Sequence, residues 1–471
     1  MEIMSMGNKK PNIIFIVLDS LRAGHVSCYG YERETTPNID KIAKGGVIFK
    51  NAISQGIATA EVHASWFTGL YLSEHGVHSG NKKYINDKLK ILPHILKQSG
   101  YETVAFSNNP FVSKFKGMDR GFNTFYDPHN FDSIWDKRLS TRVVNKFLNI
   151  IHLDYLEYAI KYRAERMVDK MIEWLKHNKD TQPFFMFSIF IDTHLPHYPP
   201  RRFMKKILKV DISNDLLKKI NSNPKKILSG EILLSQKDFE VLKSLYDANI
   251  VFVDSQMRRL FKVLSKLNLL EDTVLIITAD HGDQFGEHNL IGHSMSLYDC
   301  LLKVPLIIRY PRAVPANTIF TPQVQTIDLF TTILETAGLR PDQHGNGRIG
   351  INLLNILKEG QSSNLFAYAE QGRYNVEELH NHPFNSRKWC IRTNKFKYIK
   401  SDNNRDEFYN LESDPEETDN LINQKNQEKE ELKHLLNLFV SNLRLKIEDE
   451  TNKTMETDKD TEERLKALGY F

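Results

Sequence analysis

Short apolar runs rich in β-branched and aromatic residues recur along the chain and predict buried strands. They lie at residues 13–18, 103–106, 184–191, 274–278 and 304–309. Strands that are apolar on both faces are typical of a parallel sheet covered by helices on both sides. We therefore expect a mostly parallel central sheet.

Helical patterns alternate with these strands. A helix is predicted over 39–44, after Pro37 and Asn38, and another over 167–176, where the apolar residues lie on one stripe. A longer helix is expected to begin at Ser235, because Ser235 and Asp238 have the spacing of a capping box. Alternating strands and helices predict an α/β fold with a doubly wound sheet.

The chain divides by pattern into two parts. Residues 1–359 carry the α/β pattern, with lysine-rich helical insertions at about 130–179 and 201–235. The lysine doublets in the second insertion are better explained as solvated helix faces than as a binding patch. Residues 360–471 predict a small antiparallel α+β unit on one edge of the main sheet, with strands at 389–392, 397–400 and 407–410 and a helix over about 425–445.

Composition narrows the class of protein. Of 471 residues, 41% are hydrophobic and 26% charged, which suits a large packed core and excludes a disordered chain. The net charge of +4 is too small to indicate nucleic acid as a partner. No apolar run approaches the ~20 residues of a membrane span. The three cysteines lie far apart, and the N-terminal segment lacks a signal-peptide pattern, so a reducing cytoplasmic location is expected.

Acidic residues and histidines follow three of the predicted strands. Asp19 follows the first, Asp192 and His194 follow the third, and Asp280 and His281 follow the fourth. The carboxyl ends of parallel strands share one edge of a sheet, where ligands bind in such folds. An aspartate after a strand can also cap the next helix. Three such ends together favour a site for one divalent ion, with Ca²⁺, Mg²⁺, Mn²⁺ and Zn²⁺ all open.

A series of short motifs runs along the chain in a fixed order. The motifs are PNII at 11–14, DSLR at 19–22, CYGY at 28–31, TPNID at 36–40, TG at 68–69 with EHGV at 74–77, HLP at 194–196, DHG at 280–282, GEH at 286–288, VPLI at 304–307, TIDLF at 326–330, DPEE at 414–417 with NL at 420–421, and ERLKALGY at 463–470. This ordered series resembles the sulfatase family of the alkaline phosphatase superfamily. The resemblance spans nearly the whole chain and implies an alkaline-phosphatase/sulfatase-like fold and hydrolysis of anionic esters.

The sequence differs from the sulfatase pattern at the position of the nucleophile. Sulfatases carry a cysteine or serine that is converted to formylglycine, and the corresponding position here is Thr59. Formylglycine cannot form from threonine. A threonine there is similar to the phosphodiesterases and phosphoryl or phosphoglycerol transferases of the superfamily, in which a metal-bound threonine attacks phosphorus. The alternative is a threonine with a purely structural role.

The resemblance also implies a metal site. Asp19, Asp280 and His281 would supply three ligands and Thr59 the fourth. A metal lowers the pKa of a hydroxyl, which a threonine needs in order to act as a nucleophile. Ser20 replaces the second aspartate of the family's opening pair, so one metal ion is favoured over two.

Further residues are expected to contact the substrate. His194 resembles the family histidine that contacts the substrate anion, and His293 stands where sulfatases place a lysine and would act as general acid. His63 replaces the family arginine and either binds the anion or hydrogen-bonds to backbone near Thr59. Asn108 stands where sulfatases place a cationic residue and could donate a hydrogen bond to the substrate.

The leading hypothesis is a metal-dependent hydrolase, or a transferase, that cleaves phosphate, phosphonate or sulfate esters through Thr59. Its substrate would be a small-molecule, glycan-derived or lipid-derived anionic ester. Two alternatives stay open: a sulfuric ester hydrolase of the arylsulfatase kind that works without formylglycine, and a degenerate relative that binds anionic esters without cleaving them.

Overall fold

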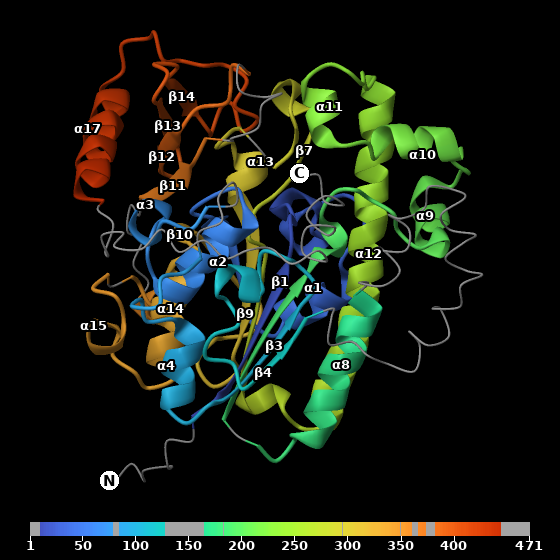
Figure 1. Cartoon of the computed structure of the whole chain (residues 1–471), viewed down its shortest axis with the longest axis vertical. Helices are drawn as coiled ribbons and strands as arrows, with labels where there is room; N and C mark the ends of the chain where they lie inside the picture. Colours follow the sequence, from blue (N-terminus) through green and yellow to red (C-terminus); the bar gives the residue numbers. More distant parts are fainter. Residues whose placement is uncertain are drawn as a thin grey trace.

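The structure is a computed structural model, and it describes residues 10–78, 84–127, 164–181, 183–293, 295–348, 350–359, 366–373 and 382–443. An eight-stranded sheet forms its centre, in the order β10-β2-β9-β6-β1-β5-β3-β4 (Figure 1). The strands are β1 (Asn12–Leu18), β2 (Val47–Ile53), β3 (Glu102–Ser107), β4 (Thr124–Tyr126), β5 (Phe184–Phe190), β6 (Thr273–Thr278), β9 (Lys303–Arg309) and β10 (Thr318–Gln325).

The sheet is mostly parallel, as the apolar runs predict. The exception is β9, which pairs antiparallel with both β6 and β2. The chain between β6 and β9 stays at one edge of the sheet, so β9 starts where β6 ends and runs back beside it. The described residues of this segment form the β7–β8 hairpin (Gln284–Phe285 and Ile291–Gly292) and short turns of helix.

Other differences from the sequence prediction concern the end of one strand and strands that were not predicted. The strand predicted over 184–191 ends at Phe190, because Ile191 begins a 3₁₀ turn. The pattern missed three strands of this sheet: β2, in which Lys50 and Asn51 interrupt the apolar run, β10, which is partly exposed, and β4, which has only three residues.

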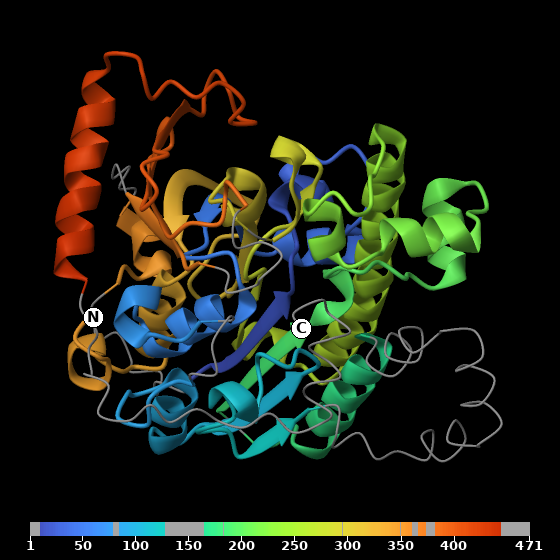
Figure 2. The ribbon, with the colours of Figure 1, turned by 45° about the horizontal axis from the view of Figure 1, so that its top comes forward.

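Helices cover both faces of the sheet (Figures 1 and 2). On one face α2, α4 and α14 contact one another, and on the other α12 contacts α1 and α8. The helices of the α/β part are α1 (Pro37–Ala43), α2 (Thr59–Thr68), α3 (Leu72–His75), α4 (Leu92–Gln98), α8 (Ala164–His177), α12 (Gln236–Lys266), α13 (Asp299–Leu302), α14 (Asp328–Thr336), α15 (Pro341–His344) and α16 (Leu353–Glu359).

Of the two helix starts predicted from the sequence, the one at Ser235 is confirmed and the one at residue 39 is wrong. The capping box is present: the Ser235 hydroxyl accepts from the Asp238 N–H at 3.2 Å, and the Asp238 carboxylate accepts from the Ser235 N–H at 2.8 Å. The predicted start of α1 is wrong, because this helix begins at Pro37 and places Asn38 inside its first turn. The Asn38 amide instead donates to Asp254 at 2.6 Å.

The second insertion is helical, with α9 (Arg201–Leu208), α10 (Asn214–Ile220) and α11 (Pro224–Leu228). Of the first insertion, residues 128–163 lie outside the described residues. The rest includes α8, whose predicted apolar stripe is buried and consists of Met167, Met171, Trp174 and Leu175. The boundary at 359/360 stays a prediction.

The C-terminal unit is a second, antiparallel sheet packed beside β10. Its elements are β11 (Ala367–Gln371), β12 (Lys388–Arg392), β13 (Phe396–Ser401), β14 (Glu407–Asn410) and α17 (Gln427–Asn442). The Tyr368 N–H donates to the Gln325 side chain at 2.9 Å, and the Gln323 amide donates to the Arg392 carbonyl at 2.7 Å. This sheet therefore lies against one edge of the main sheet, as the sequence predicts.

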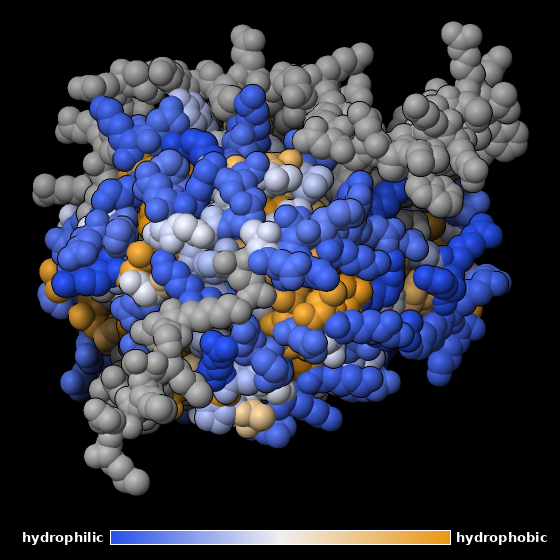
Figure 3. Space-filling view, turned by 90° about the horizontal axis from the view of Figure 1, so that it is seen from below, coloured by the Kyte–Doolittle hydropathy of each residue, from blue (hydrophilic) through white to orange (hydrophobic). Residues whose placement is uncertain are grey.

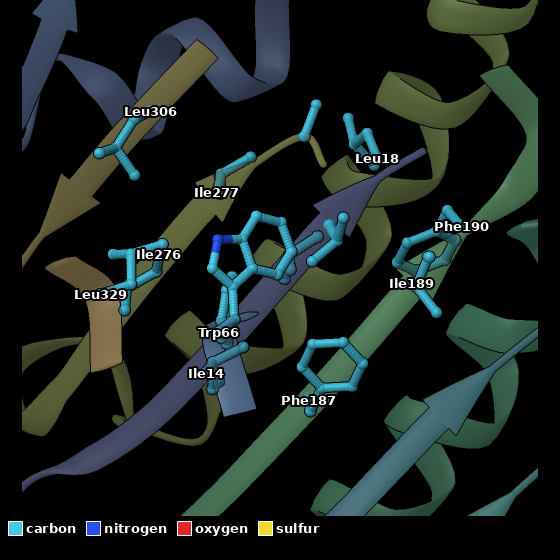
Figure 4. Close-up of a cluster of buried hydrophobic side chains, with 14 of the residues drawn as sticks. Ile14, Leu18, Trp66, Phe187, Ile189, Phe190, Ile276, Ile277, Leu306 and Leu329 are labelled. Carbon is cyan, nitrogen blue, oxygen red and sulfur yellow. The ribbon is translucent and has the colours of Figure 1, made fainter. Parts of the chain in front are cut away.

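The main core fixes the helix that begins at Thr59. Figure 4 shows the indole of Trp66 lying over β1 between side chains of β6 and β5. Its ring centre is 5.2 Å from that of Phe15, and its N–H donates to the Thr326 hydroxyl at 3.0 Å. Truncating a buried tryptophan costs about 3–5 kcal/mol, so Trp66 is a strong anchor for α2.

The surface is largely hydrophilic in the view of Figure 3, with one larger hydrophobic patch right of the centre and smaller hydrophobic spots elsewhere. Among the described residues, no helix combines the length and the apolar character that crossing a membrane requires.

Candidate functional site

Two aspartates lie at the ends of adjacent strands. Asp19 directly follows β1, and Asp280 follows β6 after one residue. The two strands are parallel neighbours, with Val17 opposite Thr278. Both side chains are completely buried. The parallel register therefore brings two carboxylates together away from water.

His281 lies at the centre of the group. Its Nε2 is 3.8 Å from Oδ1 of Asp19, 3.7 Å from Oδ2 of Asp280 and 3.4 Å from Oγ1 of Thr59. Ligand atoms of one divalent ion each lie about 2.0–2.6 Å from it, so any two are no more than about 4–5 Å apart. The ligand atoms of Asp19, Asp280 and His281 all lie within 4.8 Å of one another, close enough to share one ion, and Thr59 lies beside His281.

Two observations on the carboxylates test whether a cation fits. Oδ2 of Asp280 is buried and has no hydrogen-bond partner among the described residues. Burial raises the pKa of Asp19 well above its usual range, and the charge of Asp280 raises it further. A divalent cation would satisfy the unpaired oxygen and neutralise both charges. The donor set of two carboxylates and one imidazole fits such an ion.

Asp19 is held by two residues that the sequence analysis did not assign to the site. The Asn109 amide donates to Oδ2 of Asp19 at 2.6 Å, and the Ser20 hydroxyl donates to Oδ1 at 2.9 Å. Hydrogen bonds of this kind orient metal ligands. Asn109 follows β3, so its position after a strand was the available signal.

Ser20 also links the two strand ends through its backbone. Its φ of 60° lies in the left-handed region, which serine rarely adopts. This conformation accompanies a hydrogen bond of 3.1 Å from the Ser20 N–H to Oδ1 of Asp280. Strained backbone of this sort is found at functional sites.

Thr59 is the first residue of α2. A helix N-terminus carries partial positive charge, which favours a bound anion near it. Asp280 and His281 come from β6, so the group combines helix and strand elements that are far apart in the sequence.

His63 lies one turn after Thr59 on α2. Its Nδ1 donates to the Thr59 carbonyl at 2.8 Å, while its ring packs against Trp66 and Phe187. Burial lowers its pKa to about 4. Of the two roles expected for His63, the structure shows the hydrogen bond to backbone at Thr59.

Asn108 is completely buried and holds the chain after β5. Its Oδ1 accepts a hydrogen bond of 2.9 Å from the Ile191 N–H. The neighbouring Asn109 makes the contact with Asp19. The expected contact of Asn108 with the substrate stays a prediction.

His194 and His293 form a pair beside His281. Their Nε2 atoms are 3.0 Å apart, and the His293 ring stacks on His281 with ring centres 4.2 Å apart. Nδ1 of His293 donates to the Ile57 carbonyl at 2.8 Å, and Nδ1 of His194 donates to the Leu195 carbonyl. Because carbonyls only accept, each Nδ1 keeps its proton, and the Nε2 contact is a hydrogen bond only when one ring carries a second proton.

Burial opposes that second proton. It lowers the pKa of His194 to about 4 and the pKa of His293 well below its ordinary value, with neighbouring His281 adding to both effects. An anion beside the pair favours the protonated form.

Asp192, which follows the same strand as His194, does not join the site. Both its carboxylate oxygens accept from the Ala164 N–H at 3.0 Å, at the start of α8. This is the helix-capping role that an aspartate after a strand can take.

Family models match most of the chain. A model described as Sulfatase matches residues 11–339, and one described as N-sulphoglucosamine sulphohydrolase, C-terminal, matches residues 286–444. An N-acetylglucosamine-6-O-sulfatase of Bacteroides thetaiotaomicron is 24% identical over 469 residues, which covers 88% of this chain and 83% of the relative. An arylsulfatase of Clostridium perfringens is 23% identical, with 92% of this chain and 94% of the relative covered.

Solved structures share the fold. One, a protein in complex with its substrate D-glucosamine-2-N,6-O-disulfate, has a TM-score of 0.72 at 21% identity and covers 92% of this chain and 98% of that protein. The phosphonate monoester hydrolase of Agrobacterium radiobacter has a TM-score of 0.71 at 19% identity and covers 91% and 95%. At these identities the likeness shows the fold alone.

Proposed function

Because the chain belongs to the sulfatase family, we propose that it is a metal-dependent ester hydrolase that attacks phosphate, phosphonate or sulfate esters with the hydroxyl of Thr59. The observation that carries this proposal is the 3.4 Å distance between Oγ1 of Thr59 and Nε2 of His281. That nitrogen also lies within 3.8 Å of the carboxylates of Asp19 and Asp280.

Different residues of the chain would bind the metal ion, orient its ligands and favour the anionic ester. Asp19, Asp280 and His281 would hold one divalent cation, and such an ion supplies a lowered pKa for a nearby hydroxyl and charge neutralisation for the ester. Asn109 and Ser20 fix the orientation of Asp19. The N-terminus of α2 favours the negative charge of the ester beside Thr59.

The bond changes follow from this placement. Oγ1 of Thr59, whose proton would pass to water when a bound cation lowers its pKa, forms a bond to phosphorus or sulfur, and the bond to the leaving oxygen breaks. The protonated His293 gives the proton on its Nε2 to that oxygen, and His194 stabilises the charged ring through the 3.0 Å contact. Water then cleaves the threonine ester, while His293 takes up a proton from the water.

The substrate class is an anionic ester, and a sulfated or phosphorylated sugar is the form we favour. Support comes from solved relatives of the same fold. One is bound to D-glucosamine-2-N,6-O-disulfate, and another to the carrageenan oligosaccharide κ-ι-κ-neocarrahexaose. Phosphorus esters remain in the class because a phosphonate monoester hydrolase shares the fold and because position 59 is a threonine.

The experiment is a trapping measurement on the full chain. The protein is loaded in turn with Ca²⁺, Mg²⁺, Mn²⁺ and Zn²⁺, and each form is mixed with 4-nitrophenyl phosphate, phenylphosphonate and sulfate esters and quenched in acid. Mass spectrometry should find a phosphate or sulfate adduct on the peptide that contains Thr59. Turnover with the adduct on a different residue would refute the nucleophile, and binding without turnover for every metal and ester would favour a non-catalytic binder.

A sulfuric ester hydrolase is the second candidate within the same site, and the sulfatases among the relatives favour it. The same panel separates the two, because a sulfuric ester hydrolase prefers the sulfate over the phosphate and phosphonate at equal leaving group.

A further inference from the structure

A cavity lies between the main sheet and the C-terminal unit. Its volume is about 440 Å³, within the range of small-molecule sites in proteins. It opens where β2 ends and β9 begins, at the same edge of the sheet as the candidate site. Lys50, Lys303, Arg392 and Asp299 are among its lining residues.

The cavity is distinct from the candidate site. None of the site residues described above lines it. Its wall at Cys300 packs against the backbone next to His281, since the Gly282 N–H donates to the Leu301 carbonyl at 2.7 Å. A Cβ on Gly282 would lie 2.0 Å from the Cys300 carbonyl oxygen, so no space connects the two at this point.

Three of the four carboxylates that line the cavity already pair with a cation. Asp299 is paired with Arg392 at 2.7 Å and with Lys397 at 2.5 Å. Lys397 also pairs with Glu417 at 2.6 Å. On the opposite wall Glu287 is paired with Arg22 at 2.7 Å, and Glu416 is exposed.

Two lysines facing the cavity have no such counter-charge. The half-buried Lys303 ammonium makes no hydrogen bond and no ion pair with any residue in the described part of the chain. The Lys50 ammonium donates to the Cys28 carbonyl at 3.3 Å and lies over the Tyr29 ring, but it has no ion pair within the described ranges.

The charges in this corner do not balance. Four cationic side chains line the cavity, those of Arg22, Lys50, Lys303 and Arg392, and Lys397 lies behind its wall. They face four carboxylates, those of Glu287, Asp299, Glu416 and Glu417, which leaves a net charge of +1. Burial lowers the pKa of Lys303; Asp299 acts in the opposite direction, and the charges of Arg392 and Lys50 add to the lowering. Bound negative charge would relieve this repulsion.

We propose that this cavity binds a divalent oxyanion of the sulfate or phosphate class, held between the ammonium groups of Lys50 and Lys303. The oxyanion is either free in solution, as the product of ester cleavage would be, or esterified to a sugar. Ammonium groups make strong charge-assisted hydrogen bonds to such oxygens. The proposal does not depend on Thr59, because it concerns a separate cavity and is measured by binding.

The experiment is calorimetric titration of sodium sulfate into the metal-loaded full chain and into three variants. Lys303→Met and Lys50→Met remove one charge each at similar side-chain length. Lys205→Met is the matched control, because Lys205 lies on α9 with 64% of its side chain exposed. We expect a binding event that weakens by about tenfold or more in the first two variants and is unchanged in the control.

A second measurement locates the anion. Crystals of the parent protein soaked in selenate, an isostere of sulfate, should show anomalous density between Lys50 and Lys303. Equal sulfate affinity in the parent and all variants, or selenate density only beside Asp19 and Asp280, would overturn the proposal. If Lys303→Met does not fold, Lys50→Met and the selenate position decide the question.

A third titration distinguishes the two sources of the oxyanion. Glucose 6-sulfate that binds the cavity more tightly than inorganic sulfate identifies an esterified ligand. Equal or weaker binding identifies the free anion. In either case the affinity for the tighter-binding ligand must be lower in Lys303→Met than in the parent protein.

Discussion

Oγ1 of Thr59 lies 3.4 Å from Nε2 of His281, although 222 residues separate the two in the sequence. This contact joins the N-terminus of α2 to the end of β6. His281 in turn lies within 3.8 Å of the buried carboxylates of Asp19 and Asp280. The proposed function requires the hydroxyl of Thr59 at this position.

Replacing Thr59 tests the nucleophile directly. We expect Thr59→Ala to lower kcat by at least about 1000-fold, because the attacking oxygen is lost. Thr59→Ser keeps the oxygen and should keep part of the activity. The matched control is Thr68→Ala on the same helix, whose hydroxyl donates to the Ala64 carbonyl. Parent-level activity in Thr59→Ala would exclude the proposed nucleophile.

Metal binding should stabilise the fold through Asp280. A cation at 100 times its Kd adds about 2.7 kcal/mol to the free energy of unfolding. We expect a divalent cation to raise the Tm of the parent and of Asp192→Asn, whose carboxylate caps α8 instead. The Tm of Asp280→Asn should not respond. A cation-dependent rise of equal size in Asp280→Asn would place the ion elsewhere.

Asn109 is expected to tune the metal affinity. Asn109→Ala removes the 2.6 Å hydrogen bond to Asp19 and should weaken metal binding by about 10–100-fold, as measured by calorimetry. Activity at saturating metal should recover. The control is Asn178→Ala at the end of α8, remote from the site. An unchanged metal affinity in Asn109→Ala would show that Asp19 needs no such support.

The role of His293 appears in the dependence on the leaving group. Without a general acid, His293→Gln should lower kcat by about 100-fold or more for alkyl esters. The rate for 4-nitrophenyl esters should change little, because 4-nitrophenolate leaves without a proton. The exposed His177→Gln serves as control. An equal loss for both leaving groups would assign His293 to binding rather than to proton transfer.

The buried carboxyl group of Asp328, which lies outside the candidate site, should make the free energy of unfolding depend on pH. Burial raises its pKa to about 7, above the value of about 4 in an unfolded chain. The folded protein therefore binds the proton more tightly, and the free energy of unfolding falls as the pH rises from 4 to 7. Urea unfolding at pH 5 and pH 7.5 should show a smaller difference for Asp328→Asn than for the parent. An identical difference would contradict the shifted pKa.

Local pattern was enough for the fold class and for the edge at which the site lies. Apolar runs of strand length report burial, and alternation with helices restricts the chain to a few topologies. The parallel pattern therefore predicts that the ends of β1, β5 and β6, which lead into Asp19, His194 and Asp280, lie at one edge of the sheet. Position 59 came from a resemblance in motif order, which no local pattern around Thr59 would give.

Only the tertiary structure decided the direction of β9, the contact of Asn109 with Asp19, and the pairing of His194 with His293. The tertiary structure alone also shows the cavity onto which Lys50 and Lys303 face without an ion pair. Each depends on residues 90 or more positions apart, or on which edge of the sheet a connection follows. The periodic pattern of hydrophobic residues indicates which side chains are buried. It does not indicate which distant side chains contact each other, because the packing of whole helices and strands determines those contacts.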